Sequence, residues 1–527
     1  MALSNFSLLG NKNYKFRNWA GIYSTNPQLY FEPDTIDQVI EIVKNANEKG
    51  QKITIVGAGH TPNNICITRN WMVSLTKLNH VGMLCSNHAS YADVTVEAGI
   101  TSHDLNEYLT KHGYSLQNLP SINTPTMAGM ISTGSHGSSA YHGLVSSQIV
   151  DITLVNGQGE LVFVDSETQP ELFRAMLLSL GQIGIIVKMT IRVVPNFNLR
   201  VTQEIFEFDK IIDMWDKIWL TTEYIKIWWY PYNRKCIVWK GERTNDSVPK
   251  DSSNNLKEKQ FLSNKFNRFL YQFLLWCSTQ ICGRLTPFVE KWIFNRQYRN
   301  VIEPAVITSL DGFTLDCLYS QFVDEWGCPL VNGPEVLRKL ENIVDEGAKT
   351  NKFYIHCPVE IRCSNTTVPP DLSVNDSEKN YLLKGAIYGN NLHPLLDNTN
   401  NLGQYVAIDQ VTNDQLTLFI NATMYRPFGF NSKTYDWFTQ FEQVMIEADG
   451  KPHWAKNFIG ATELITDPSA SKTVKYKDYQ CRGLGKFIKE KFQDNLIEFQ
   501  RIKSIQDPNG IFETNKDWLL RNGIAVE

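Results

Sequence analysis

The chain has 527 residues, 51 of them basic and 55 acidic, so its net charge at pH 7 is only −4. This balance gives no support for nucleic-acid binding, because proteins of that class concentrate positive charge. The length exceeds the size at which one hydrophobic core stops growing, so two or three domains are expected. The sequence contains no run of about 18 apolar residues, which argues against a membrane-spanning helix, and its ten cysteines show no zinc-site spacing.

The first hundred residues alternate predicted helices and strands. Thr35 can cap a helix whose apolar residues follow at helical spacing. The apolar face of this helix comprises Ile36, Val39, Ile40 and Val43. We expect an apolar strand at 52–56, a strand of alternating polarity at 93–98, and a capped helix that begins at Ser102. This mixture predicts an α+β fold.

The strand at 52–56 leads into a first glycine loop, residues 56–61. The loop consists of Val56, Gly57, Ala58, Gly59, His60 and Thr61. Its two glycines leave backbone N–H groups free to receive a pyrophosphate, and His60 adds a nucleophilic imidazole, so the loop suggests a flavin attached through His60. A Rossmann fingerprint is disfavoured, because its third glycine would fall at Pro62, which has no N–H. The alternative is a glycine-rich turn with an incidental histidine.

A second glycine loop, residues 128–139, is small or polar at almost every position. Such a segment lets the backbone approach a large planar or phosphorylated ligand closely. Stretches of this composition are also common as flexible loops. Because this one follows the first loop by about seventy residues in the same predicted domain, the pair favours a dinucleotide held between them.

The rest of the chain divides into a strand-rich part, an irregular part and a tail. Residues 151–165 predict a β-hairpin, and a strand from 184 to Pro195 closes the first domain. From about 197 to 450 the sequence is rich in aromatic residues and is expected to be irregular, with a polar insertion at 241–258 that predicts a loop. Residues 507–512 predict a turn followed by an anchoring aromatic residue.

Residues 261–294 mix Phe, Leu, Trp and Ile with Lys and Arg. An interfacial pair of helices on a membrane surface has this composition. Two ordinary core helices are the alternative.

Motifs along the whole chain resemble the aldonolactone oxidase branch of the vanillyl-alcohol-oxidase-type flavoproteins, and within it the fungal D-arabinono-1,4-lactone oxidases. The matching segments are Val-Gly-Ala-Gly-His at 56–60, Thr-Gly-Ser-His-Gly-Ser-Ser at 133–139, His-Trp-Ala-Lys at 453–456, Asp-Pro-Asn-Gly at 507–510, Asn-Trp-Ala-Gly-Ile-Tyr at 18–23, Trp-Trp-Tyr-Pro-Tyr at 228–232 and Ser-Gln-Phe-Val-Asp-Glu-Trp-Gly at 320–327. The resemblance implies a two-subdomain FAD-binding domain of the PCMH type at 1–197, an α+β substrate cap at 198–450, and a segment at 451–527 that returns to the flavin.

In this family the histidine of the first loop bears the FAD covalently, which implies the same role for His60. Thr61 departs from the serine of many relatives and keeps the hydroxyl. Pro120 is expected at the position that controls access of oxygen, where glycine or proline marks an oxidase. The residues expected to bind the cofactor are Val56, Gly57, Ala58, Gly59, His60, Thr61, Asn118, Pro120, Thr126, Gly129, Thr133, Gly134, Ser135, His136, Gly137 and Ile186.

Four residues are expected to act on the substrate. Glu360 and Arg362 are two apart, so on a strand both side chains point to one face, although a surface ion pair across a strand would look the same. The resemblance assigns Arg362 to charge stabilisation and Glu360 to the substrate hydroxyl. His453 and Lys456 are three apart, on one helical face or at a turn, and by themselves they indicate the start of a surface helix. The resemblance implies that they reach the cleft, bind the substrate through hydrogen bonds and handle protons near the flavin. His136 and His356 are interpreted as packing residues.

The resemblance implies oxidation of an aldono-1,4-lactone, D-arabinono-1,4-lactone, by O₂, with FAD as cofactor, no metal and no nucleic acid. The alternatives are an oxidase or dehydrogenase of L-gulono-1,4-lactone, L-galactono-1,4-lactone or an alditol, and an inactive membrane-surface scaffold without flavin. The expected location is the surface of a mitochondrial membrane, and otherwise the cytoplasm.

Overall fold

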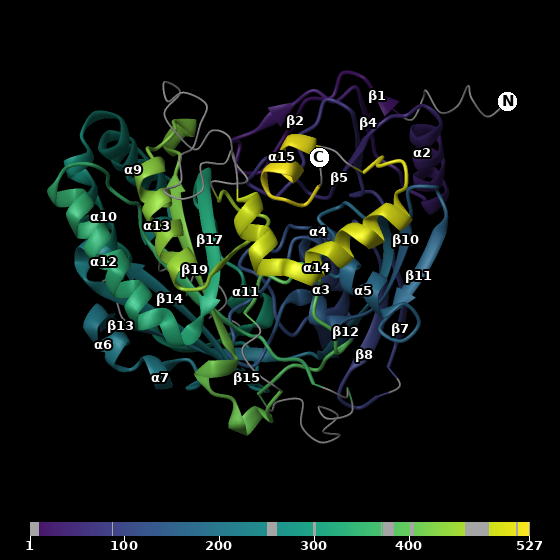
Figure 1. Ribbon diagram of the computed structural model, residues 1–527. Helices are drawn as coiled ribbons and strands as arrows, with labels where there is room; N and C mark the ends of the chain where they lie inside the picture. The colour runs from purple at the N-terminus through teal and green to yellow at the C-terminus, as the bar shows by residue number, and fades with distance from the viewer. Residues whose placement is uncertain are drawn as a thin grey trace.

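The computed structural model describes residues 10–86, 88–249, 261–298, 302–369, 372, 384–400, 405–458, 484–512 and 515–525. Among the described residues, its α+β architecture has a four-stranded, a six-stranded and a two-stranded sheet in one half of the molecule and an eight-stranded sheet in the other (Figure 1). No helix within these ranges is long and apolar enough to cross a membrane.

The first sheet has the order β1-β4-β6-β5, and β4, β6 and β5 are parallel. Its strands are β1 (Gly10–Asn11), β4 (Leu29–Phe31), β5 (Ile53–Val56) and β6 (Trp71–Ser74), and β2 (Phe16–Arg17) pairs with β3 (Ser24–Thr25) beside it. Helix α2 (Ile36–Glu48) connects β4 to β5 and is capped by Thr35 as predicted. Its most buried face is centred on Val39 and Ile42, so the predicted Ile36 and Ile40 lie at the edge of that face.

The second sheet is antiparallel, with the order β11-β10-β12-β8-β7, and β9 pairs with β12. Its strands are β7 (Val81–Cys85), β8 (Ala92–Glu97), β9 (Tyr114–Ser115), β10 (Ile149–Val155), β11 (Leu161–Asp165) and β12 (Ile185–Pro195). The helices of this part are α3 (Ser102–Lys111), α4 (Met127–Ser132) and α5 (Pro170–Met176). The predicted hairpin at 151–165 and the strand that ends at Pro195 are confirmed.

The third sheet is antiparallel, with the order β16-β13-β15-β14-β18-β19-β17-β20. Its strands are β13 (Asn198–Glu207), β14 (Tyr224–Tyr230), β15 (Lys235–Thr244), β16 (Ile302–Thr308), β17 (Gln321–Pro329), β18 (Val359–Asn365), β19 (Leu416–Tyr425) and β20 (Lys451–Pro452). The prediction that 197–450 is irregular is therefore wrong. The strands escaped detection because the sheet is covered on both faces: every residue of β14 and β17 is buried, which removes the alternation of polar and apolar residues. The predicted loop at 241–258 is also wrong at its start, since 241–244 belong to β15, and 250–258 lie outside the described residues.

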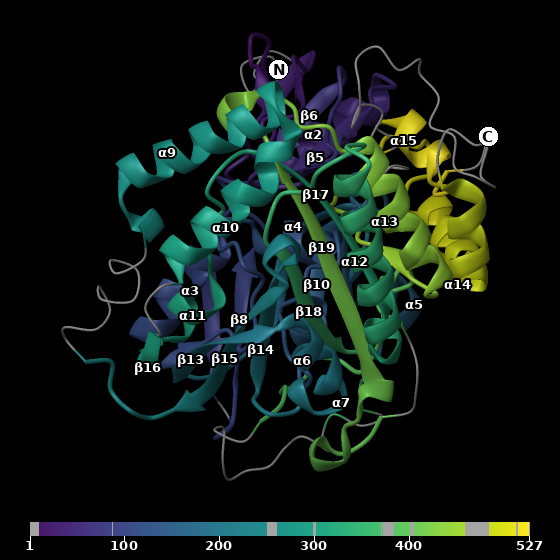
Figure 2. The same cartoon turned by 90° about the vertical axis from the view of Figure 1, so that its left-hand side faces the viewer.

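Helices cover the outer face of the third sheet, and the first half of the chain covers its inner face (Figures 1 and 2). The helices in this half are α6 (Phe208–Asp213), α7 (Trp215–Ile218), α9 (Lys265–Trp276), α10 (Thr286–Gln297), α11 (Ser309–Phe313), α12 (Gly333–Lys349) and α13 (Tyr435–Glu447). Helices α14 (Gly485–Gln506) and α15 (Lys516–Arg521) return to the first half of the molecule. Beside the predicted turn at 507–512, Ile53 N–H donates to Ile511 C=O at 2.7 Å. Phe512, the predicted anchoring aromatic residue, is fully buried.

Candidate active site

A cavity of about 690 Å³ lies between the two glycine loops and the inner face of the third sheet. Its volume falls in the range of ligand pockets. All but three of the sequence-predicted site residues line it. The residues among them that line it are Val56, Gly57, Ala58, Gly59, His60, Thr61, Pro120, Thr126, Gly129, Thr133, Ser135, His136, Ile186, Glu360, Arg362, His453 and Lys456. The structure thus brings together segments that are up to 400 residues apart in sequence.

The glycines of the first loop answer two different steric demands. A Cβ at Gly57 would collide with Thr126 Oγ1, so this glycine allows the first loop to pack against the N-terminus of α4. Gly59 has a backbone φ of +67°, which residues other than glycine rarely adopt. The loop is therefore shaped by its own packing as well as by any ligand.

The imidazole of His60 makes one side-chain hydrogen bond. Its Nε2 lies 2.7 Å from Thr124 Oγ1, and its buried Nδ1 has no partner of good geometry among the described residues. Burial lowers the pKa of His60 to about 4, so the imidazole is neutral at pH 7. The backbone of Ala58 lies close to the ring and acts on its pKa in the opposite sense to burial. The ring of Trp19, in the segment 18–23 that resembles the family, stacks near it with 5.9 Å between ring centroids. A neutral imidazole at a cavity wall is a competent nucleophile.

The second loop contributes a wall and its support. Thr126 caps α4 by accepting from Gly129 N–H, and Gly129, Thr133 and Ser135 face the cavity. The other three predicted residues are not among those that line it. Gly137 packs directly on the Asn118 side chain, and Gly134, with φ of +72°, faces Leu178 and Asn398. These three residues therefore pack the second loop against the protein behind it.

Glu360 and Arg362 lie on β18 with both side chains toward the cavity, as the period of two predicts. Arg362 Nε is 3.5 Å from Glu360 Oε2, and Glu360 also accepts from Trp228 Nε1 at 3.4 Å. Only 5% of the Arg362 side chain is exposed, so the alternative of a surface ion pair is wrong. Burial disfavours the charge of Arg362, but the carboxylates of Glu325 and Glu360 outweigh it and raise the Arg362 pKa.

His453 and Lys456 lie in a turn after β20, in which Lys456 N–H donates to His453 C=O at 3.0 Å. His453 Nδ1 accepts from Ala455 N–H at 3.2 Å, and burial holds the His453 pKa well below its usual value, so the single ring proton sits on Nε2. Lys456 Nζ points to the cavity wall, where 21% of its side chain is exposed.

Asn63 ties this turn to the first loop, and sequence reasoning did not single it out. Its side-chain amide donates to the carbonyls of Trp454 at 2.8 Å and Lys456 at 3.0 Å. The available signal was its position three residues after His60. A buried side-chain amide needs several hydrogen-bond partners, so an asparagine at that position can join neighbouring segments.

Glu325 is the second functional residue that sequence reasoning missed. It is fully buried on β17, accepts from Arg362 Nη2 at 2.5 Å and pairs with Lys456 Nζ at 3.1 Å. Burial alone would raise its pKa, but the charges of Arg362 and Lys456 prevail and hold the pKa well below its usual value. The adjacent acids Asp324 and Glu325, in the segment 320–327 that resembles the family, were the signal. Both are buried, and carboxylates are almost never fully buried without partners.

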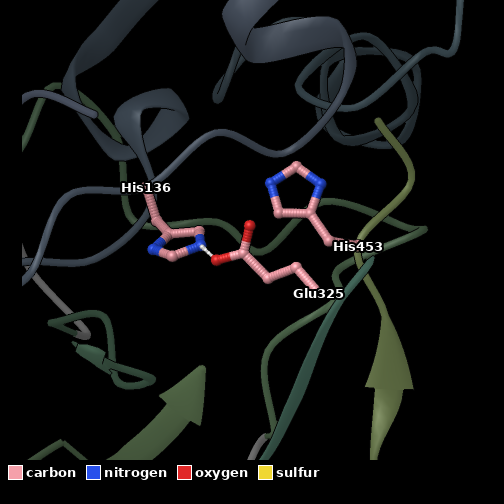
Figure 3. A group of neighbouring side chains, drawn as sticks. All are labelled: His136, Glu325 and His453. Carbon is pink, nitrogen blue, oxygen red and sulfur yellow. Dashed lines mark ion pairs between the residues drawn. The ribbon is translucent and has the colours of Figure 1, made fainter. Parts of the chain in front are cut away.

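His136, Glu325 and His453 come together from three different segments, and their ligand atoms lie within 4.8 Å of one another (Figure 3). Such a group can hold a metal ion. Here the carboxylate already pairs with Arg362 and Lys456, whose positive charges oppose a divalent cation. The cluster therefore has the character of a charge network.

His356 and Arg426 have structural roles. His356 is buried, and its Nδ1 accepts from Tyr425 N–H at 2.9 Å, in agreement with its interpretation as a packing residue. Arg426 donates to the carbonyls of Ala20 and Gly21 and so holds the N-terminal segment 18–23 against β19.

Residues 189–522 match the family model described as D-arabinono-1,4-lactone oxidase. The chain belongs to this family. It is 50% identical to the D-arabinono-1,4-lactone oxidase of Eremothecium gossypii over 97% of this chain and 96% of that protein, and 49% identical to the enzyme of Saccharomyces cerevisiae over 97% of each. Residues 27–165 match an FAD binding domain.

Solved structures of cholesterol oxidases share the fold of this chain. A solvent-stable cholesterol oxidase superposes with a TM-score of 0.72 at 16% identity, covering 98% of both chains. The cholesterol oxidase of B. sterolicum gives 0.69 at 15% identity, covering 96% of both. The protein is thus an FAD-dependent lactone oxidase with a PCMH-type fold.

Proposed function

We propose that the protein oxidises D-arabinono-1,4-lactone to dehydro-D-arabinono-1,4-lactone (D-erythroascorbate) and reduces O₂ to H₂O₂. Bound FAD would supply the two-electron redox chemistry between the substrate C–H bond and O₂. The observation that carries the proposal is the placement of Glu360, Arg362 and Lys456 on one wall of the cavity whose other wall carries His60.

Each of these side chains has a task in the oxidation of a CH–OH group. Glu360 lines the cavity and accepts a hydrogen bond from the substrate hydroxyl. This hydrogen bond orients the substrate C–H bond, and the Glu360 carboxylate receives the hydroxyl proton. Arg362 and Lys456 supply positive charge where negative charge develops on the lactone oxygens and on the reduced cofactor. The buried surroundings strengthen these interactions, because they exclude water.

FAD is held covalently by His60 in this proposal, with Nδ1 as the bonded atom. The neutral imidazole supports this choice, and so does the contact of Nε2 with Thr124, which leaves Nδ1 as the nitrogen without a side-chain partner among the described residues. The variant His60→Ala should release all flavin on acid denaturation, whereas the wild-type protein should keep it on the polypeptide. Flavin that stays bound to the denatured variant would contradict the assignment.

The substrate is tested by oxygen uptake with a panel of γ-lactones and alditols. We expect the highest kcat/KM with D-arabinono-1,4-lactone, formation of one H₂O₂ per lactone, and a loss of two orders of magnitude or more in Glu360→Gln. Higher kcat/KM with L-gulono-1,4-lactone, L-galactono-1,4-lactone or an alditol would contradict the proposed substrate.

We further propose that the face formed by α9, α10 and residues 428–430 docks on an anionic membrane. The helix pair predicted at 261–294 corresponds to α9 and α10, and α9 projects at the edge of the molecule (Figure 2). This face exposes large apolar side chains, which core helices would bury. They are Phe266 (69% exposed), Phe269 (56%), Phe273 (43%), Ile281 (67%), Leu285 (41%), Phe288 (70%), Phe428 (43%) and Phe430 (51%).

The charge around this face favours anionic lipid. Lys265, Arg284 and Lys291 are exposed on the two helices and their connection, and Glu290, the one acidic residue between 261 and 298, is buried. Exposed aromatic residues beside basic ones are typical of interfacial helices. The membrane that the family resemblance implies is mitochondrial.

Sedimentation with phosphatidylcholine vesicles, with and without cardiolipin, tests the docking face. Binding should require cardiolipin and should fall at least tenfold in the double variant Phe266→Ser/Phe269→Ser, because each phenylalanine contributes about 1.5–3 kcal/mol when buried. Phe163→Ser is the matched control, since Phe163 is 52% exposed on β11 in the other half of the molecule. Equal binding by the two variants would contradict the proposal.

A further inference from the structure

Glu325 lies behind the cavity wall and contacts three side chains that line the cavity. Its Oε1 accepts from Arg362 Nη2 at 2.5 Å and lies 3.2 Å from His136 Nε2, and its Oε2 is 3.1 Å from Lys456 Nζ. The carboxylate is fully buried, and it is not among the residues that line the cavity. It therefore acts on the reacting atoms only through its partners.

The sheet register places Glu325 in line with Glu360. Asn421 on β19 pairs with Glu325 on one side and with Glu360 on the other, so the three side chains form a row across adjacent strands and point to the same face. Asp324 points to the opposite face, where its carboxyl meets Glu442 of α13. The two neighbouring acids of β17 thus belong to different environments.

Backbone contacts hold the partners of Glu325 in place. His453 N–H donates to the Glu325 carbonyl at 2.9 Å, which attaches the turn that carries Lys456 to β17. The His136 ring stacks on Phe419 with 3.7 Å between centroids, and its Nδ1 lies 2.9 Å from the Gly137 carbonyl, so Nε2 faces Glu325 (Figure 3). Glu325 consequently joins the second glycine loop, β18 and the C-terminal segment.

The charges of this group balance. Arg362 and Lys456 contribute two positive charges, and Glu325 and Glu360 contribute two negative ones. Removing the Glu325 carboxylate would leave one positive charge in excess at the cavity wall. It would also leave the buried Arg362 without its shortest hydrogen bond, which is the costly way to break a buried ion pair.

We infer that Glu325 is a positioning residue, which aims Arg362 and Lys456 at the substrate and neutralises one of their two charges. The expected effect of Glu325 on lactone oxidation rests on the proposed function. The expected effect on the charge near the flavin requires only that FAD is bound. A neutral side chain that served packing alone could be replaced without changing the charge that the flavin senses.

The test compares Glu325→Gln with the wild-type holoenzyme in two measurements. The first is kcat/KM for the lactone, which should fall about 10- to 100-fold, the equivalent of a lost hydrogen bond to a charged group. The second is the affinity of the oxidised flavin for sulfite, which rises when positive charge near the ring increases. One unit of charge within about 10 Å at an effective dielectric constant of 20 corresponds to about tenfold tighter sulfite binding.

Asp324→Asn is the matched control, because it removes the adjacent buried carboxyl from the other face of β17. Burial and the nearby carboxyl of Glu442 raise the pKa of Asp324 well above its usual value, so this carboxyl is neutral and its replacement removes no charge. The variant should alter stability and leave sulfite affinity within about twofold of wild type. Glu325→Asp keeps the negative charge and should therefore have nearly the wild-type sulfite affinity. This second variant keeps the test decisive if Glu325→Gln folds poorly.

A double-mutant cycle separates action through Lys456 from an independent effect. In the Lys456→Met background, Glu325→Gln should reduce kcat/KM by a smaller factor than in wild type. Unchanged or weaker sulfite binding in Glu325→Gln, or fully multiplicative losses in the cycle, would overturn the inference. Failure of the proposed substrate would show differently, as an inactive wild-type enzyme with an intact sulfite response.

Discussion

The contact between Gly57 and Thr126 offers a sharp test of how the two glycine loops are built. An added Cβ at Gly57 would overlap Thr126 Oγ1, and Gly57 does not have a positive φ, so the penalty for Gly57→Ala is steric. Overpacking of this kind costs about 1–3 kcal/mol in free energy of unfolding. Thr126→Ala alone should cost about 1 kcal/mol, because Thr126 Oγ1 caps α4.

The double variant distinguishes this contact from a general weakness of the loop. Independent effects would add to about 2–4 kcal/mol. Since Thr126→Ala removes the atom that the new methyl group would hit, we expect the double variant to lose only about 1–2 kcal/mol. Gly57→Ala should therefore be less harmful in the Thr126→Ala background than in wild type.

Urea unfolding followed by flavin fluorescence measures these differences, and retained FAD after gel filtration gives a second reading. Gly143→Ala is the control, because the nearest atom to its added Cβ would be 3.4 Å away, an ordinary contact. A harmless Gly57→Ala, or additive losses in the double variant, would refute the proposed packing of the first loop on α4.

The other predictions concern charge and pH. Arg362→Lys should lower kcat/KM at least tenfold, because a lysine cannot reach Glu325 and Glu360 together; wild-type rates would contradict this. Burial lowers the pKa of His356 from 6.5 to about 4, so this histidine should contribute about 3 kcal/mol to the loss of unfolding free energy as pH falls from 6.5 to 4. His356→Asn keeps an acceptor for Tyr425 and should reduce the total loss by about that amount, and identical acid unfolding curves would oppose this prediction. Asp507→Ala, which deprives two backbone N–H groups of an acceptor, should cost about 1–2 kcal/mol in urea unfolding.

Local motifs explain why much of the first half could be predicted. The cap at Thr35, the hairpin at 151–165 and the two glycine loops depend on residues close in sequence, whose preferences are strong. The third sheet escaped prediction for the opposite reason. Its central strands are buried on both faces and include charged residues such as Glu325, so neither alternation nor hydrophobicity marks them.

The sequence by itself determined the chemistry available to the site: a histidine in a tight glycine loop, a Glu-x-Arg pair on one face of a strand, and a His-x-x-Lys turn. The tertiary structure decided that these groups meet, because pairing of β19 with both β17 and β18 sets the register that aligns Glu325 with Glu360. A shift of one residue would turn these side chains to the other face of the sheet. Long-range register of this kind comes from the packing of the whole sheet, and no local pattern specifies it.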